Sequence, residues 1–161
     1  MDEIKCLYFD DQIDDPTDPL GAFLFLLENN LQKKKNILIK KVSERKIAEK
    51  EMEDFRYALI FLDIRINPQK GGGMENYRWE RTGIGMIENI RNGVYEEKKS
   101  GTSTPKDVPI IVITAVADTQ AQEKINRIGG GENNQYKLAL FEKPVSADDV
   151  ASKVFEFLDF D

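Results

Sequence analysis

The sequence predicts an α/β fold, a doubly wound five-stranded parallel sheet with helices on both faces. The first observation is the apolar run 58–62, which ends at Asp63. This run is too short to cross a membrane and too continuous for a half-exposed strand, so it indicates a central strand buried on both faces. The second observation is that strand-like and helix-like stretches alternate along the chain, which favours parallel strands joined by right-handed crossovers. The third is that several strand-like runs lead into polar residues.

Five stretches are predicted as strands from their apolar and β-branched content. They are Glu3–Phe9, Asn36–Val42, Ala58–Asp63, Val108–Thr114 and Leu138–Glu142. In an open parallel sheet, ligands bind where loops leave the carboxyl ends of the strands. We therefore expect the functional site at that edge of the sheet.

Five helices are predicted between and after the strands, each with an apolar face at helical spacing. They cover Pro19–Gln32, Ser43–Asp54, Gly83–Arg91, Asp118–Ile128 and a last helix that opens at Ser146. The residues expected to face the core are Leu20, Phe23, Leu24, Leu27 and Leu31 in the first helix, Ile47, Met52 and Phe55 in the second, Ile84, Ile87 and Ile90 in the third, and Val150, Val154, Phe157 and Leu158 in the last. Gly129–Gly131 is expected to end the fourth helix, and Ser146 is expected to cap the last one.

Composition narrows the class of protein. The chain has 161 residues and a formal net charge of −6, which argues against direct nucleic-acid binding, because phosphate contacts need an excess of Lys and Arg. Cys6 is the only cysteine and histidine is absent, so disulfide frameworks, histidine metal sites and triads that need a histidine are excluded within the chain. No signal peptide and no apolar stretch of about 18 residues is present, which predicts a cytoplasmic protein without a membrane anchor.

Three carboxylates are expected to converge at the carboxyl edge of the sheet. Asp10 and Asp11 follow the first strand and Asp63 ends the third, so they meet if these strands are neighbours. Carboxylates that lie close together cannot all stay ionised without a cation. Oxygen ligands favour Mg²⁺, which shares its coordination sphere with phosphate oxygens. Thr114 offers a hydroxyl and Lys143 a positive charge, both suited to the oxygens of a transferring phosphoryl group.

This set of residues resembles the receiver domain of two-component response regulators, over nearly the whole chain. The matching motifs are Asp10-Asp11, Asp63, Gly83 at the start of the third helix, Thr114-Ala115 and Lys143-Pro144. The resemblance implies a flavodoxin-like fold with strand order 2-1-3-4-5 and a single receiver domain over 1–161. It also implies insertions at about 67–82, 92–107 and 129–137.

The resemblance further implies that Asp63 is the phosphoacceptor and that a sensor histidine kinase or a phosphotransfer protein is the donor. It implies Thr114, Ala115 and Lys143 as phosphoryl-contacting residues and a cis peptide bond before Pro144. It implies Mg²⁺ held by Asp10 or Asp11, by Asp63 and by the backbone carbonyl of Arg65. The expected output is a conformational change of the surface near strands four and five, read by a downstream effector or by a second copy in a homodimer.

Two features depart from the family pattern. Receiver domains commonly carry an aromatic residue three positions before the lysine, where this chain has Leu140, with Phe141 and Tyr136 nearby. The long loop after Asp63 contains four residues that could cover the site or dock a kinase, Tyr77, Arg78, Trp79 and Arg81. Of the three insertions, only this loop leaves the edge that carries Asp63.

Two alternatives to a phosphorylation switch remain open. A phosphohydrolase of the haloacid dehalogenase type also uses an aspartate nucleophile with Mg²⁺, Thr and Lys, but it needs a second acid two residues after the first, where this chain has Gln12. The other alternative is a receiver-like interaction module that is never phosphorylated. It is disfavoured because no motif residue has been replaced.

Overall fold

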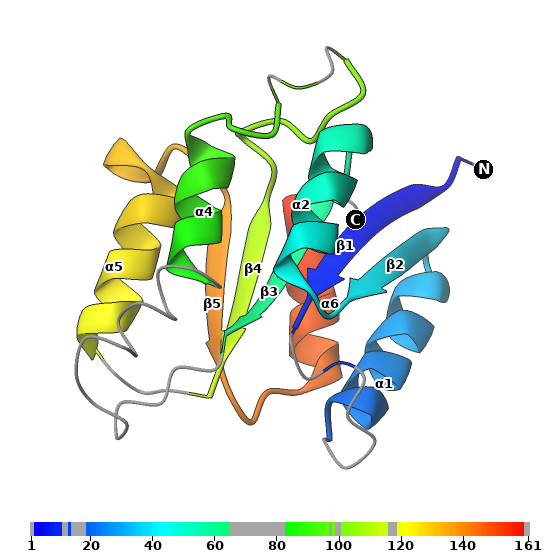
Figure 1. Cartoon of the computed structure of the whole chain (residues 1–161). Coiled ribbons are helices and arrows are strands. Elements are labelled where there is room, and N and C mark those ends of the chain that lie inside the picture. Colours follow the sequence, from blue (N-terminus) through cyan, green and yellow to red (C-terminus); the bar gives the residue numbers. More distant parts are fainter. Residues whose placement is uncertain are drawn as a thin grey trace.

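The computed structural model describes residues 2–10, 13, 19–64, 83–96, 98, 101–115 and 119–159. These form a five-stranded sheet covered by helices (Figure 1). The strands are β1 (Ile4–Phe9), β2 (Ile37–Val42), β3 (Leu59–Ile64), β4 (Ile110–Thr114) and β5 (Leu138–Glu142). The helices are α1 (Leu20–Gln32), α2 (Arg45–Asp54), α4 (Ile84–Arg91), α5 (Thr119–Gly130) and α6 (Ala147–Phe157), with a short 3₁₀ turn at Glu132–Asn134.

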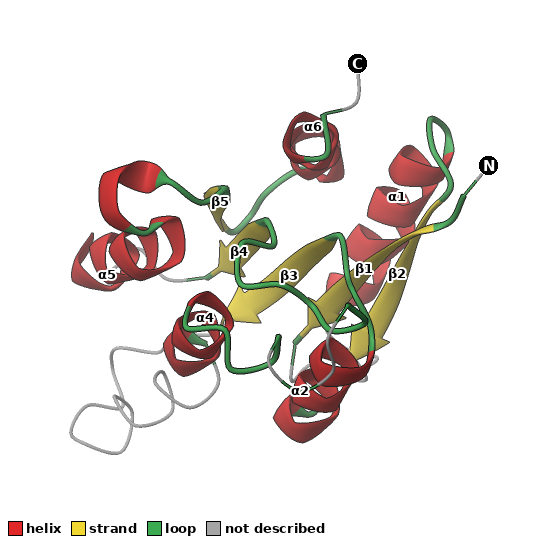
Figure 2. Ribbon diagram, turned by 90° about the horizontal axis from the view of Figure 1, so that it is seen from above, coloured by secondary structure: helices red, strands yellow, loops and turns green. Residues whose placement is uncertain are grey.

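All neighbouring strands are parallel, and their order is β2-β1-β3-β4-β5. This confirms the predicted fold class and strand order. Helices α1 and α6 cover one face of the sheet, and α2, α4 and α5 cover the other (Figure 2). Among the described residues, no helix is both long and apolar enough to cross a lipid bilayer.

The central strand is buried on both sides, as its sequence predicts. Because side chains alternate along a strand, Ile60 and Leu62 pack under α2, α4 and α5, whereas Leu59 and Phe61 pack under α1 and α6. The ring of Phe61 stacks on Tyr8 of β1, with centroids 5.1 Å apart. The two hydrophobic layers therefore meet at β3 and hold its carboxyl end in place.

Two helix predictions need correction. Ile47 of α2 and Phe55 directly after the helix are about half exposed, at 47% and 48%, and within α2 only Ala48 and Met52 are fully buried. The reason is that α2 covers the sheet near its β2 edge, so only a narrow stripe of the helix finds a partner. In α5, the first two of the three glycines belong to the helix, which ends at Gly130, and Gly131 follows it with a φ of 73°.

The cap of the last helix is confirmed. The backbone N–H of Asp149 donates to the Ser146 hydroxyl oxygen at 3.0 Å, which satisfies one of the free donors of the first turn. In α6 the fully buried apolar residues are Ala147, Val150, Ala151, Val154 and Phe155, while Phe157 and Leu158 are half-buried.

The polar connection before β4 binds the C-terminal end of α2, a role that its sequence does not indicate. The hydroxyl of Ser103 donates to the Glu53 carbonyl at 2.5 Å, and the N–H of Thr104 donates to the Met52 carbonyl at 2.8 Å. The Thr104 hydroxyl also donates to the carbonyl of Phe55 at 2.6 Å. These bonds satisfy carbonyls at the C-terminal end of α2, which a helix leaves without internal partners.

The single cysteine gives a test of the packing of β1. Cys6 is fully buried, and burial raises the pKa of its thiol to about 12. At pH 8 the thiol is protonated and inaccessible, so we expect a disulfide reagent to react about a thousandfold more slowly with the native protein than with the urea-unfolded chain. Absorbance of the released thiolate measures both rates. Similar rates in the two states would mean that β1 is not the buried strand described here.

Candidate functional site

Four predicted site residues lie at the carboxyl edge of the sheet, on neighbouring strands. The register pairs Phe9 with Leu62, so Asp10, directly after β1, and Asp63 of β3 occupy the next position along the two segments. On the other side of β3, Ile64 pairs with Thr114, and Thr114 pairs with Glu142 of β5, directly before Lys143. Asp10, Asp63, Thr114 and Lys143 are therefore brought to one edge.

Asp63 is the second-last residue of β3, and its side chain is completely buried. The Nζ of Lys143 lies 2.7 Å from Oδ2 of Asp63, and the Lys143 side chain is 26% exposed. This approach is an ion pair that is not aligned as a hydrogen bond, so neither Asp63 oxygen receives a hydrogen bond within the described part of the chain. Both oxygens therefore keep lone pairs for a further ligand or an incoming electrophile.

Asp10 is also fully buried. Its backbone is fixed on both sides, because its N–H donates to the Val42 carbonyl at 3.1 Å and its carbonyl accepts from Ile13 at 3.1 Å. Tyr8 and Phe61 stack on one face of the sheet, and Asp10 and Asp63 each follow two residues later. By the alternation of strand side chains, the two carboxylates lie on that same face.

Thr114 is 1% exposed and ends β4. Its carbonyl accepts a hydrogen bond from the N–H of Lys143 at 2.7 Å, which ties the ends of β4 and β5 together. The next residue, Ala115, is exposed. The Lys143–Pro144 peptide bond is cis, in agreement with the expectation from the sequence.

The donor atoms at this edge suit a hard divalent cation. Two buried carboxylates lie side by side, and the Asp63 oxygens have no hydrogen-bond donor among the described residues. Asp10 and Asp63 would hold Mg²⁺ here, since oxygen ligands of this kind are the ones it prefers. The described part of the chain holds no cluster of three such ligands. Asp11 and Arg65, the other predicted ligands, lie outside the described residues.

Two further predicted elements are Gly83 and the loop at 67–82. Gly83 is buried directly before α4. The loop residues Tyr77, Arg78, Trp79 and Arg81 lie outside the described part of the chain, as does the whole of 67–82.

Neither of the two aromatic residues near Leu140, Phe141 and Tyr136, lies on the same side of the sheet as Leu140 next to the site. Leu140 is half-buried and packs on the side of α5, whereas Phe141 packs on the opposite side of the sheet with α6. Tyr136 precedes β5 at the far edge, where its ring lies 4.7 Å from the guanidinium carbon of Arg91. No aromatic side chain of β5 therefore lies on the α5 side of the sheet.

The sequence did not predict an apolar cavity of about 310 Å³ beside Asp63. It is lined by the start of α1, the loop after β5 and side chains of β1, β3 and β4, and its charged lining residues are Asp63 and Lys143. The apolar lining includes Tyr8, Leu20, Phe23, Ile113 and Val145. The available signal was a pair of prolines that line the cavity, Pro19 and Pro144, since prolines mark where the chain turns.

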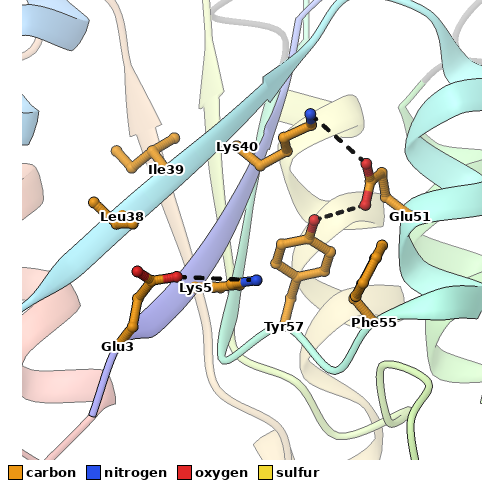
Figure 3. A pocket seen from close by; sticks show the side chains of 8 residues that line it. All are labelled: Glu3, Lys5, Leu38, Ile39, Lys40, Glu51, Phe55 and Tyr57. Atoms are coloured by element: carbon orange, nitrogen blue, oxygen red, sulfur yellow. Dashed lines mark hydrogen bonds and ion pairs between the residues drawn. The ribbon is translucent and has the colours of Figure 1, made fainter.

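A second cavity, of about 330 Å³, lies at the opposite end of β1 and β2 (Figure 3). Its charged groups contact each other. Lys40 and the Tyr57 hydroxyl both reach Glu51, at 3.9 and 2.9 Å, and Lys5 lies 3.9 Å from Glu3 (Figure 3). Because these charges already have partners of opposite sign, this cavity shows no charge directed at a ligand.

No protein-family profile and no curated relative matches the sequence. Solved structures do match. A CheY-like response regulator receiver domain protein from Methanospirillum hungatei covers 98% of this chain and 95% of its own, with a TM-score of 0.59 and 18% identity. A response regulator from Thermotoga maritima covers 98% of both chains, with a TM-score of 0.64 and 15% identity. A signal receiver domain of a histidine kinase from Clostridium thermocellum covers 99% of this chain and all of its own, with a TM-score of 0.64 and 14% identity. Identities this low establish a shared fold, so the function must be argued from the site.

Proposed function

Because this chain has the fold of response regulator receiver domains, we propose that it is a phosphorylation-dependent signalling switch with Asp63 as the phosphoacceptor. The observation that carries the proposal is the buried Asp63 carboxylate, which lies on the strand next to β1 and Asp10 and 2.7 Å from the ammonium group of Lys143. This carboxylate lies next to the Lys143 ammonium group, and within the described part of the chain its oxygens receive no hydrogen bond.

The proposed reaction is a group transfer to Asp63. One Asp63 oxygen attacks phosphorus, the bond from phosphorus to the donor breaks, and the donor leaves with that electron pair. The product is an aspartyl phosphate. Bound Mg²⁺ would supply positive charge against the transferring phosphoryl oxygens. Lys143 would exchange its contact with the Asp63 carboxylate for a phosphoryl oxygen, and the Thr114 hydroxyl would donate to another.

The donor in this proposal is a phosphohistidine on a sensor histidine kinase or a phosphotransfer protein. Asp63 and Lys143 line the apolar cavity, so a donor protein at Asp63 would lie next to its apolar walls. Two apolar residues elsewhere on α1 are also exposed, Phe25 at 65% and Leu26 at 54%.

The switch itself follows from the loss of the Asp63–Lys143 pair. When Lys143 turns to the phosphoryl group, its backbone hydrogen bond to Thr114 links the change to the end of β4. The surface formed by α5, β5 and α6 begins at these two strand ends, so a partner that binds it would distinguish the two states. A downstream effector or a second copy of the chain is the proposed reader.

One experiment distinguishes the proposed phosphorylation switch from a phosphohydrolase. The wild-type protein is incubated with Mg²⁺ and either acetyl phosphate or a generic phosphomonoester. We expect the intact mass to rise by one phosphoryl group per chain with acetyl phosphate, and no turnover of the phosphomonoester. Addition of EDTA before the donor should suppress the mass increase. Many turnovers of the phosphomonoester per chain would instead support the hydrolase.

A further inference from the structure

Arg91 is a buried charge that the proposed reaction does not use. It is the last residue of α4 and is 8% exposed. Its Nε donates to the Gly129 carbonyl at 2.6 Å, and its Nη1 donates to the carbonyls of Lys106 and Val108, both at 2.7 Å. Its Nη2 donates to the carbonyl of Lys137 at 3.3 Å.

These four carbonyls belong to three segments of the chain. One is at the C-terminal end of α5, two are in the connection before β4, and one belongs to the residue before β5. The ends of α4 and α5 and the beginnings of β4 and β5 gather at one edge of the sheet, at the top of Figure 1, opposite the edge that carries Asp63. The fork of the guanidinium group thus joins all of them at once.

The environment of Arg91 consists mainly of carbonyl groups and an aromatic face. Burial lowers the pKa of its guanidinium to about 10, while nearby Tyr136 and Asp107 oppose that change. The group therefore stays charged at neutral pH, and its charge strengthens each hydrogen bond. Loss of the side chain would leave several buried carbonyls without a donor.

The end of α5 is also tightly packed against β5. A Cβ atom added to Gly129 would lie 2.8 and 2.9 Å from the two methyl carbons of Leu138. The amide of Gly131 closes the helix by donating to Arg127 at 3.1 Å, and the amide of Tyr136 donates to the Gly130 carbonyl at 2.9 Å. These contacts and the Arg91 bonds act on the same helical turn.

The other end of α5 lies close to the candidate site. The helix begins at Thr119, five residues after Thr114, and its 12 residues span about 18 Å at the usual helical rise. One end of α5 therefore follows the residue that would contact the phosphoryl group, and the other end is held by Arg91.

We propose that Arg91 is a positioning residue that anchors the C-terminal end of α5, so that occupation of the Asp63 site swings the N-terminal end about this anchor. The movement of the N-terminal end rests on the proposed function, because occupation of the Asp63 site would cause it. The anchoring of the C-terminal end does not, because the Arg91 hydrogen bonds are present in the unoccupied protein. A rigid helix held at one end can respond to a displacement at the other end only by tilting.

The test is hydrogen exchange along α5, with beryllium fluoride and Mg²⁺ as the probe of the Asp63 site. In the wild type we expect the probe to change exchange in the first half of the helix and to leave the amides of Gly131 and Tyr136 unchanged. In Arg91→Lys, a single ammonium group cannot reach all four carbonyls. We expect those two amides to exchange about tenfold faster without the probe, and to respond when it is added.

A matched control and an independent variant complete the test. Arg127→Lys changes an exposed arginine of the same helical turn and should behave as the wild type. Gly129→Ala crowds Leu138 without removing a hydrogen-bond donor, so it should loosen the same two amides.

The proposed function and the anchor can fail separately. A uniform probe response along wild-type α5, or unchanged amides in Arg91→Lys, would overturn the anchor. If the intact mass shows phosphorylation but α5 does not respond at all, the swing is wrong and the proposed function stands. If no phosphorylation occurs, the proposed function fails, and the swing fails with it.

Discussion

Replacement of Lys143 by methionine is expected to lower the free energy of unfolding of the Mg²⁺-free protein by about 1–3 kcal/mol. The substitution leaves the fully buried Asp63 carboxylate without its ammonium partner at 2.7 Å and beside a second carboxylate. Breaking a buried pair from one side costs more than this range, but the Lys143 side chain is 26% exposed, so water replaces part of the lost interaction. Urea unfolding in EDTA, followed by circular dichroism, measures the change.

The control for Lys143→Met is Lys153→Met. Lys153 pairs with Glu156 at 2.9 Å on the outside of α6, where the partner side chain is 64% exposed. An exposed pair of this kind is worth about 0–1 kcal/mol, so the control should lose little. Equal losses in the two variants would show that the ion pair at Asp63 has no special environment.

Asp10→Asn is expected to have the opposite effect. Removing one of two neighbouring buried carboxylates relieves repulsion, so we expect the Mg²⁺-free protein to gain about 1 kcal/mol. The same substitution removes a proposed Mg²⁺ ligand, so the variant should lose most of the stabilisation that Mg²⁺ gives the wild type by mass action. Thermal unfolding with and without Mg²⁺ measures both effects.

Asp2→Asn is the matched control for Asp10→Asn, because Asp2 is exposed and lies ahead of β1. It should leave both the stability and the Mg²⁺ response unchanged. The proposed cation site is wrong if the wild type and both variants unfold at the same temperature whether or not Mg²⁺ is present.

The sequence predicted those parts of the structure that depend on local patterns. Burial of β3 on both faces requires an unbroken apolar run, and the chain shows one before Asp63. Strand alternation then places Asp10 and Asp63 on one face, once β1 and β3 are neighbours. The Ser146 cap was also visible, because a cap needs only residues within one helical turn.

Features made by distant segments could not be predicted. The four carbonyls that bind Arg91 lie 15 to 46 residues from it, and a single arginine at a helix end gives no signal of them. The apolar cavity beside Asp63 depends on how α1 meets the loop after β5. Ile47 and Phe55 were assigned to the core because helical spacing shows which residues share a face, but not how much of that face the sheet covers.

Asp63→Asn tests the central claim most directly. The wild type and the variant are each incubated with acetyl phosphate and Mg²⁺, and the intact mass is followed by peptide mapping of any added group. The amide has nearly the same shape as the carboxylate but is a poor nucleophile, so the variant should fold and stay unlabelled. We predict one phosphoryl group on wild-type Asp63 and none on the variant. Labelling of the variant at another residue, or an unlabelled wild type, would contradict the assignment of Asp63 as the phosphoacceptor.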